Sequence, residues 1–194
     1  MSLKKKQIDL LYVPPFNKKN HNKKKKEVIR FMNLVDKNGY IKVNTPILDI
    51  GPENYFDSSL TEFTKVRSFN TVGNLDRNWY VSGCTKEVFK TVCMFDIIEH
   101  LKNPDTFLCN LKSYIDKETD IYITFPFRWN SKYWSHNHWH EMEPKRFKIL
   151  IEDAGYHIVD SKTIVWWYAL LGIRPFLKYF YARHHYCLYH IRLK

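Results

Sequence analysis

Histidine side chains recur at short spacing in the stretch SHNHWHE. His136, His138 and His140 occupy alternate positions, and Glu141 follows the last of them. In an extended conformation the three rings would share one face, as the ligands of a metal ion can. No second ligand cluster accompanies them, so we expect no metal site here. Contact with a substrate, proton transfer by His138 and a purely structural role stay open.

A second group of polar side chains follows the apolar run TVCMFDII. Asp96 and Glu99 flank the end of this run, and His100 comes directly afterwards. An unperturbed histidine titrates near pH 6.5 and can accept a proton at neutral pH, which makes His100 a candidate general base. The alternatives are a backbone hydrogen bond for His100 and a structural hydrogen-bonding role for Asp96.

A third group stands in the stretch ILDIGPENYF, where a short apolar run ends in Asp49 and Gly51. Gly51 has no Cβ and lets the backbone come close to a ligand. The residues Pro52, Glu53 and Asn54 would disturb a phosphate-binding turn, so the stretch favours a ligand without phosphate. For Asp49 the alternative is a carboxylate that caps the following loop.

Alternating strands and helices are expected to position these groups. Continuous apolar runs predict buried strands over residues 46–50 and 91–98, and further strands are expected over residues 66–72, 120–126, 156–167 and 186–193. Periodicity predicts helices before Gly39, over 58–65 and over 143–153, and Asn103 with Pro104 marks another helix start. This order indicates an α/β fold with a doubly wound, mostly parallel sheet and helices on both faces, which binds ligands at the carboxyl ends of its strands.

The composition describes one globular domain with a basic N-terminus. The chain has 194 residues, 44% of them hydrophobic, which suffices for one core. No run approaches the roughly 20 apolar residues that span a bilayer, and the four cysteines form no Cys-x-x-Cys pair, so we expect a cytoplasmic protein.

Residues 1–26 hold nine lysines and one aspartate, which is +8 of the net charge of +11. We expect a flexible tail over 1–22 and a domain over 23–194; binding of nucleic acid by the tail is the less favoured alternative.

Three stretches resemble the class I S-adenosylmethionine-dependent methyltransferases, in particular the small type 11 group. ILDIGPENYF resembles that family's first motif, and FKILIEDAGYHIV resembles its late helix and sixth strand. The long block MFDIIEHLKNPDTFLCNLKSYIDKETDIYITFP resembles its fourth strand, the following helix and its fifth strand. The likeness covers roughly residues 28–193. It implies a Rossmann-like, seven-stranded sheet with a reversed final hairpin, shortened around the third strand because only about forty residues separate Asp49 from the fourth strand.

The resemblance also implies S-adenosylmethionine as the cofactor and suggests residues for its site. Asp49 would bind the amino-acid end of the cofactor, and Asp76 would bind the ribose hydroxyls, with a structural turn aspartate as the alternative. The expected cofactor-binding residues are Asp49, Gly51, Glu53, Asp76, Asp96, Ile97 and Glu99, and the expected catalytic residues are His100 and His138.

The resemblance implies transfer of a methyl group to an oxygen, nitrogen or carbon atom of a small-molecule acceptor. One alternative is a non-catalytic binding or scaffold protein that keeps the fold. Another is a nucleic-acid methyltransferase, although the chain lacks the Asn/Asp-Pro-Pro-Tyr motif that base amino-methyltransferases commonly carry.

Overall fold

The computed structural model describes residue 29 and residues 41–52, 55–84, 88–127, 136–140, 142–165 and 185–194. These residues belong to two compact units. The first takes its residues from the ranges 1–42 and 53–68 and includes helix α2 (Tyr55–Thr64); the second takes them from 43–52 and 69–194. The predicted tail and nearly all of the predicted first helix lie outside the described residues.

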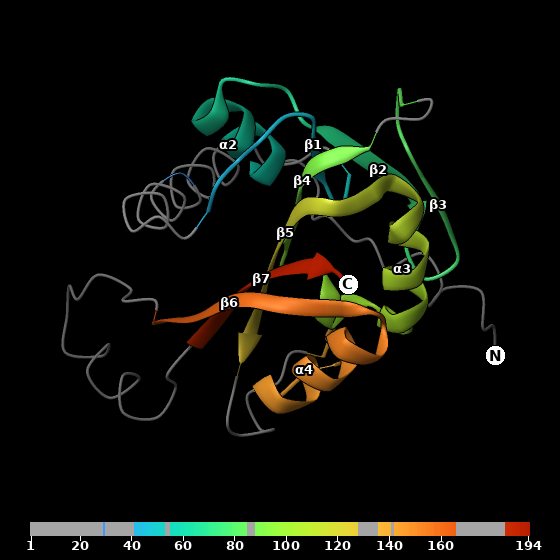
Figure 1. The fold of residues 1–194 in the computed structure, drawn as a ribbon, viewed down its shortest axis with the longest axis vertical. Helices are drawn as coiled ribbons and strands as arrows, with labels where there is room; N and C mark the ends of the chain where they lie inside the picture. Colours follow the sequence, from blue (N-terminus) through green and yellow to red (C-terminus); the bar gives the residue numbers. More distant parts are fainter. Residues whose placement is uncertain are drawn as a thin grey trace. The chain divides into compact units, whose positions relative to one another are not determined.

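The second unit is built on a seven-stranded sheet with the order β3-β2-β1-β4-β5-β7-β6 (Figure 1). Five strands run in one direction, whereas β3 and β7 run antiparallel to their neighbours. The strands are β1 (Ile47–Asp49), β2 (Phe69–Asn74), β3 (Asn78–Val81), β4 (Phe89–Phe95), β5 (Ile115–Phe127), β6 (Tyr156–Val165) and β7 (His185–Leu193). This is a Rossmann-like sheet with a reversed final hairpin, which confirms the predicted fold class.

The region around the third strand is compressed into a hairpin. β3 is antiparallel to β2 and follows it after a short turn of residues 75–77, with no helix between the two strands. Gly73 permits this close pairing, because its φ is +104° and a Cβ there would lie 2.5 Å from the carbonyl oxygen of Asn78. The expected shortening is therefore confirmed, and its physical form is a β-hairpin.

The strand predicted over residues 66–72 begins later than expected, at Phe69, and ends at Asn74. The delay has a local cause in the first unit. Lys65 has a φ of +62° directly after α2, and the hydroxyl of Thr64 accepts the N–H of Val66 at 3.2 Å. These residues end the helix and turn the chain, so they are not part of the strand.

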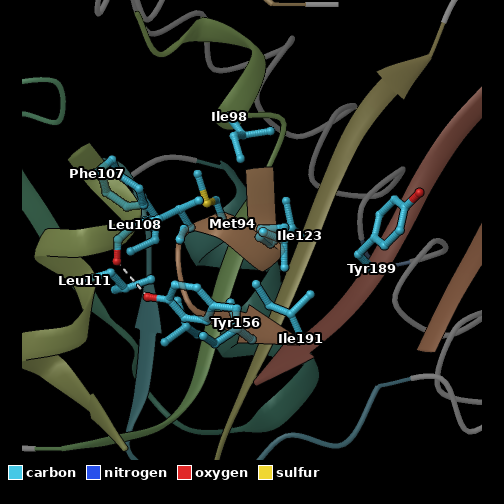
Figure 2. Close-up of a cluster of buried hydrophobic side chains, with 14 of the residues drawn as sticks. Met94, Ile98, Phe107, Leu108, Leu111, Ile123, Tyr156, Tyr189 and Ile191 are labelled. Carbon is cyan, nitrogen blue, oxygen red and sulfur yellow. Dashed lines mark hydrogen bonds between the residues drawn. The ribbon is translucent and has the colours of Figure 1, made fainter. Parts of the chain in front are cut away.

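Helices α3 (Pro104–Leu111) and α4 (Pro144–Asp153) pack on the same face of the sheet. Figure 2 shows Leu108 of α3 beside Met94 of β4 and Ile123 of β5 within the buried core. Phe147 of α4 lies 4.7 Å from Phe125 of β5, measured between ring centroids. Ile123 and Phe125 are two positions apart in one strand and therefore point to the same side.

The start of α3 at Pro104 agrees with the preference of proline for the first helical position. Asn103 occupies the N-cap position as predicted, but its side chain makes no capping hydrogen bond. Oδ1 of Asp76 instead accepts the backbone N–H groups of Lys102 and Asn103, each at 2.8 Å. Asp76 thereby ties the β2–β3 turn to the segment that precedes α3.

The predicted helix over 143–153 and the two C-terminal strands are confirmed as α4, β6 and β7. No helix formed by the described residues combines the length and the apolar composition needed to cross a bilayer.

Candidate active site

Asp49 and Gly51 stand where the chain leaves β1. Asp49 is the last residue of β1, is 3% exposed, and is in register with Asn70 of β2 and Cys93 of β4. Gly51 has a φ of +127°, and its N–H donates to the hydroxyl of Thr71 at 2.8 Å. Glycine adopts this φ without the steric cost that other residues meet. The turn after Asp49 is therefore held at the carboxyl edge of the sheet, as the sequence predicts.

Asp49 also influences the neighbouring thiol. Burial raises the pKa of Cys93 well above its ordinary value, and the Asp49 carboxylate adds to the effect. The Cys93 thiol consequently stays protonated at neutral pH, and a protonated thiol is a poor nucleophile.

The chain leaves β4 through a strained residue. Asp96 has a φ of +54°, a region that residues other than glycine adopt uncommonly. Its N–H donates to the carbonyl of Thr124 in β5 at 3.0 Å, and the hydroxyl of Thr124 donates to Oδ1 of Asp96 at 3.2 Å. Backbone strain of this kind concentrates at ligand sites, where the surrounding structure maintains it.

Asp76 lies in the β2–β3 turn, and Oδ1 of its carboxylate accepts the two backbone N–H groups described above. This is the structural role that the sequence analysis named as the alternative. Binding of ribose hydroxyls by the other carboxylate oxygen stays a prediction.

The segment after β4 and the histidine-rich loop come together. The backbone carbonyl of Glu99, in the short helix η2 (Ile98–His100), accepts the N–H groups of Trp139 and His140 at 2.8 and 3.1 Å. Nδ1 of His100 lies 3.1 Å from the carbonyl oxygen of Asn137, a residue 37 positions away in sequence. These three contacts dock the loop onto η2.

Glu99, His100 and His138 form a compact group. One potential ligand atom from each side chain lies within 4.8 Å of the others. Glu99 is 1% exposed. The rings of His100 and His138 meet edge to face, with their centroids 4.7 Å apart. Both predicted catalytic residues thus lie beside a predicted cofactor-binding residue.

Lys102 completes the docking of the loop. Its ammonium lies over the ring of Trp139, 4.4 Å from the centroid, which is cation–π geometry. Its carbonyl oxygen lies 3.2 Å from Nε2 of His140. His140 is therefore bonded to the backbone, and only His138 of the three alternating histidines joins Glu99 in the group.

The remaining residues that the sequence suggested for the site are Ile97, Glu53 and Glu141. Ile97 is partly buried and packs against the hydrophobic core, while Glu53 and Glu141 lie outside the described residues. Sequence analysis missed Thr71 and Thr124, which hold Gly51 and Asp96. For Thr124 the available signal was a single hydroxyl residue between Ile123 and Phe125 in an otherwise apolar part of the strand. Thr71 follows the polar Asn70, so the sequence offers no such signal for it.

Comparisons with solved structures bear on this topology. A SAM-dependent methyltransferase from Archaeoglobus fulgidus matches with 16% identity over 90% of this chain and 94% of that chain, with a TM-score of 0.56. The 1,6-didemethyltoxoflavin-N1-methyltransferase of Burkholderia thailandensis, solved with 1,6-didemethyltoxoflavin and S-adenosylhomocysteine, matches with 15% identity, coverages of 86% and 78%, and a TM-score of 0.53. The cyclase SpnF matches with 10% identity, coverages of 85% and 80%, and a TM-score of 0.56.

Neither a family profile nor a curated protein sequence matches the chain. At identities of this size the structural matches establish the fold and not the activity. The strand order, the reversed β7 and the neighbours agree with one another. The chain therefore has the Rossmann-like fold of the class I S-adenosylmethionine-dependent methyltransferases.

Proposed function

We propose that this protein is an S-adenosylmethionine-dependent methyltransferase that acts on an oxygen, nitrogen or carbon atom of a small-molecule acceptor. One observation carries the proposal: Asp49 and Gly51 stand together at the carboxyl end of β1, within a sheet of methyltransferase strand order. Ligands of open α/β sheets bind at this edge, where the strand order reverses. Methyltransferases among the structural neighbours support the same assignment.

The donor site follows from the chemistry of S-adenosylmethionine, which carries an ammonium, a carboxylate, a ribose diol and a sulfonium, and has no phosphate. The buried Asp49 carboxylate suits the ammonium. Gly51 lets the backbone approach the amino-acid end, and Thr71 holds Gly51 in place. The second oxygen of Asp76 would accept a ribose hydroxyl. Ile97 and Asp96 at the end of β4 would border the ligand.

In methyl transfer, a lone pair of the acceptor attacks the methyl carbon of the sulfonium. The sulfur–carbon bond breaks, and its electron pair stays on sulfur as the neutral thioether S-adenosylhomocysteine. Positioning of the two reactants can contribute about 7–11 kcal/mol to such a displacement. An acceptor hydroxyl or amine must also lose a proton, and His100 and His138 are the groups proposed to take it.

The tautomer of His100 follows from its contact with Asn137. A carbonyl oxygen can only accept a hydrogen bond, so Nδ1 of His100 carries the proton in this contact. Nε2 is then the basic atom of the ring. His100 would take the acceptor proton through Nε2.

Turnover tests the proposal. The purified chain is incubated with S-adenosylmethionine and fractionated metabolite extracts, and S-adenosylhomocysteine is quantified by mass spectrometry. We expect one or more fractions to raise S-adenosylhomocysteine release in the natural chain and to leave Asp49→Asn at background. Asp153→Asn is the matched control, because it removes an exposed carboxylate at the end of α4. No release above the Asp49→Asn background in any fraction would contradict the proposal.

A non-catalytic module with the same fold is the second candidate. The hairpin between β2 and β3 favours it, because this turn replaces a helix expected next to the adenine end of the ligand. The match to SpnF, which is named as a cyclase, also indicates that proteins not named as methyltransferases have this fold. Binding of S-adenosylhomocysteine without turnover in the same extracts would favour this candidate.

A further inference from the structure

We propose that Glu99, His100 and His138 bind a divalent transition-metal ion, with Zn²⁺ as the ion of best chemical fit. The inference goes beyond the proposed function, because a metal ion can bind here whether or not the chain transfers methyl groups. It rests on side chains from two segments that are distant in sequence and docked onto each other by backbone hydrogen bonds.

The potential ligand atoms of Glu99, His100 and His138 are close enough to bind one ion after small side-chain movements. Three atoms no more than 4.8 Å apart share a point that lies within about 2.8 Å of each of them. Metal bonds from histidine nitrogen or carboxylate oxygen to Zn²⁺ measure about 2.0–2.2 Å. Side-chain rotations that move each ligand atom by less than about 1 Å toward that point would give bonding distances.

The donor set selects the class of ion. One carboxylate oxygen and two imidazole nitrogens are typical ligands of Zn²⁺ and of neighbouring divalent first-row metals, whereas Mg²⁺ and Ca²⁺ prefer oxygen ligands alone. Glu99 is almost fully buried, and a divalent cation is one of the partners that compensate the burial of a carboxylate. Three protein ligands leave at least one coordination position for water or another ligand.

The surrounding hydrogen bonds orient the ligands as metal sites require. Nδ1–H of His100 donates to the carbonyl of Asn137 at 3.1 Å, which leaves the Nε2 lone pair available for an ion. Ligating histidines commonly donate their second ring N–H to a carbonyl or carboxylate in this way. The bonds from Trp139 and His140 to the Glu99 carbonyl fix the backbone on the C-terminal side of His138.

The site differs from the one that the alternating histidines suggested. His140 bonds to the carbonyl of Lys102, and His136 is exposed and is not part of the group. Glu99 and His100 replace these two rings. The reason is the docking of the loop, which turns His138 toward η2 and leaves the neighbouring histidines with other surroundings.

One consequence rests on the proposed function. An open coordination position beside the proposed donor site would suit an acceptor that offers an oxygen, such as a hydroxyl. Coordination lowers the pKa of a bound hydroxyl, so its proton would pass to solvent before the oxygen attacks the methyl carbon. The acceptor class implied is an oxygen-bearing small molecule.

Calorimetric titration of the full chain with ZnCl₂, after removal of metals by a chelator and without S-adenosylmethionine, tests the site. We expect one Zn²⁺ per chain and a loss of affinity of at least about 100-fold in Glu99→Gln and in His138→Ala, because removing a ligand costs more than the 10–100-fold of an outer-shell change. His136→Ala is the matched control, since it removes an exposed histidine of the same loop. It should bind Zn²⁺ like the natural chain.

A Co²⁺ titration of the natural chain keeps the test independent of how the variants fold. We expect visible absorption from Co²⁺ bound to nitrogen and oxygen ligands, abolished by one equivalent of Zn²⁺. Absence of stoichiometric binding, or equal loss in His136→Ala and His138→Ala, would overturn the inference. Binding of Zn²⁺ without binding of S-adenosylhomocysteine would contradict the proposed function alone, and the reverse result would contradict the metal site alone.

Discussion

Two residues with positive φ, Gly51 and Asp96, lie at the carboxyl ends of β1 and β4. Each is fixed by a threonine of a neighbouring strand, Thr71 for Gly51 and Thr124 for Asp96. The two threonine hydroxyls therefore shape the edge at which a ligand would bind. Substitutions at Gly51 and Asp96 can separate an effect on backbone conformation, measured as the free energy of unfolding, from an effect on ligand contact, measured as affinity.

Gly51→Ala should lower the free energy of unfolding by about 1–3 kcal/mol, because a residue with a Cβ is strained at the φ of +127°. We also expect at least a tenfold loss of affinity for S-adenosylhomocysteine, measured by calorimetry, because the new methyl group stands where the backbone approaches the ligand. Gly155→Ala is the control: its φ is +86°, and it precedes β6 at the opposite edge of the sheet. Equal effects of both variants on affinity would refute the role given to Gly51.

Asp96 should tolerate asparagine but not valine. Asparagine adopts positive φ readily and keeps an oxygen for the Thr124 hydroxyl, so Asp96→Asn should change the free energy of unfolding by less than about 0.5 kcal/mol. Asp96→Val places a β-branched residue at this φ and should cost about 1–3 kcal/mol. Urea unfolding of both variants measures the difference. Equal stability would show that the strain is not maintained in solution.

At the scale of elements, Tyr156 joins β6 to α3 (Figure 2). Its side chain is fully buried, and its hydroxyl donates to the carbonyl of Leu108 at 2.7 Å. The carbonyl lies within the last turn of α3, where helix carbonyls lack partners of their own. One buried hydroxyl thus satisfies the helix end and fixes the helix on the sheet.

Tyr156→Phe should destabilise the protein by about 1–3 kcal/mol, because a buried carbonyl loses its partner while the packing of the ring is kept. Thermal and urea unfolding provide the measurement. Tyr80→Phe is the control, since Tyr80 is 59% exposed and the same deletion there should have almost no effect. A loss below about 0.5 kcal/mol for Tyr156→Phe would mean that water or another donor replaces the hydroxyl.

Because of Cys187 in β7, we expect the free energy of unfolding to fall as the pH rises above about 9. Burial raises the pKa of its thiol from an ordinary value near 9 to about 11. Below pH 9 the thiol is protonated in both states; above pH 9 it ionises first in the unfolded chain, so the unfolded state gains stability as the pH rises. Cys187→Ala should therefore reduce the fall in unfolding free energy between pH 8 and pH 10 by about 1 kcal/mol.

The exposed Cys109 is the matched control for this measurement. Cys109→Ala should leave the alkaline slope unchanged, because the effect expected at Cys187 comes from burial and Cys109 is exposed. An identical slope for the Cys187 and Cys109 variants would contradict the expectation.

The elements differ in how far the sequence predicts them. β4 follows from a continuous apolar run, and α3 follows from Asn103 and Pro104, because both signals are local. The antiparallel pairing of β3 depends on Gly73 fitting against Asn78, a contact that periodicity does not reveal. The approach of His138 to Glu99 depends on loop docking across the sheet edge. Local patterns thus predict that the strands exist and which residue types form the site, but not the exact bounds, since the strand expected over 91–98 spans Phe89–Phe95. Tertiary contacts decide which of the site residues meet.

At the scale of the whole molecule, the second unit brings the predicted residues to strand ends on one edge of a sheet of methyltransferase order. Asp49 ends β1, Asp96 follows β4, and η2 carries Glu99 and His100 just beyond. The lysine-rich residues 1–26 are not among the described residues. Our central proposal concerns this edge alone, which we propose binds S-adenosylmethionine and its product.

Calorimetric titration of the full chain with S-adenosylhomocysteine tests that claim most directly. We predict binding of one ligand per chain with a dissociation constant in the micromolar range or below, weakened at least tenfold in Asp49→Asn and unchanged in Asp153→Asn. The absence of heat at high micromolar ligand, or equal affinity of the natural chain and Asp49→Asn, would contradict the account.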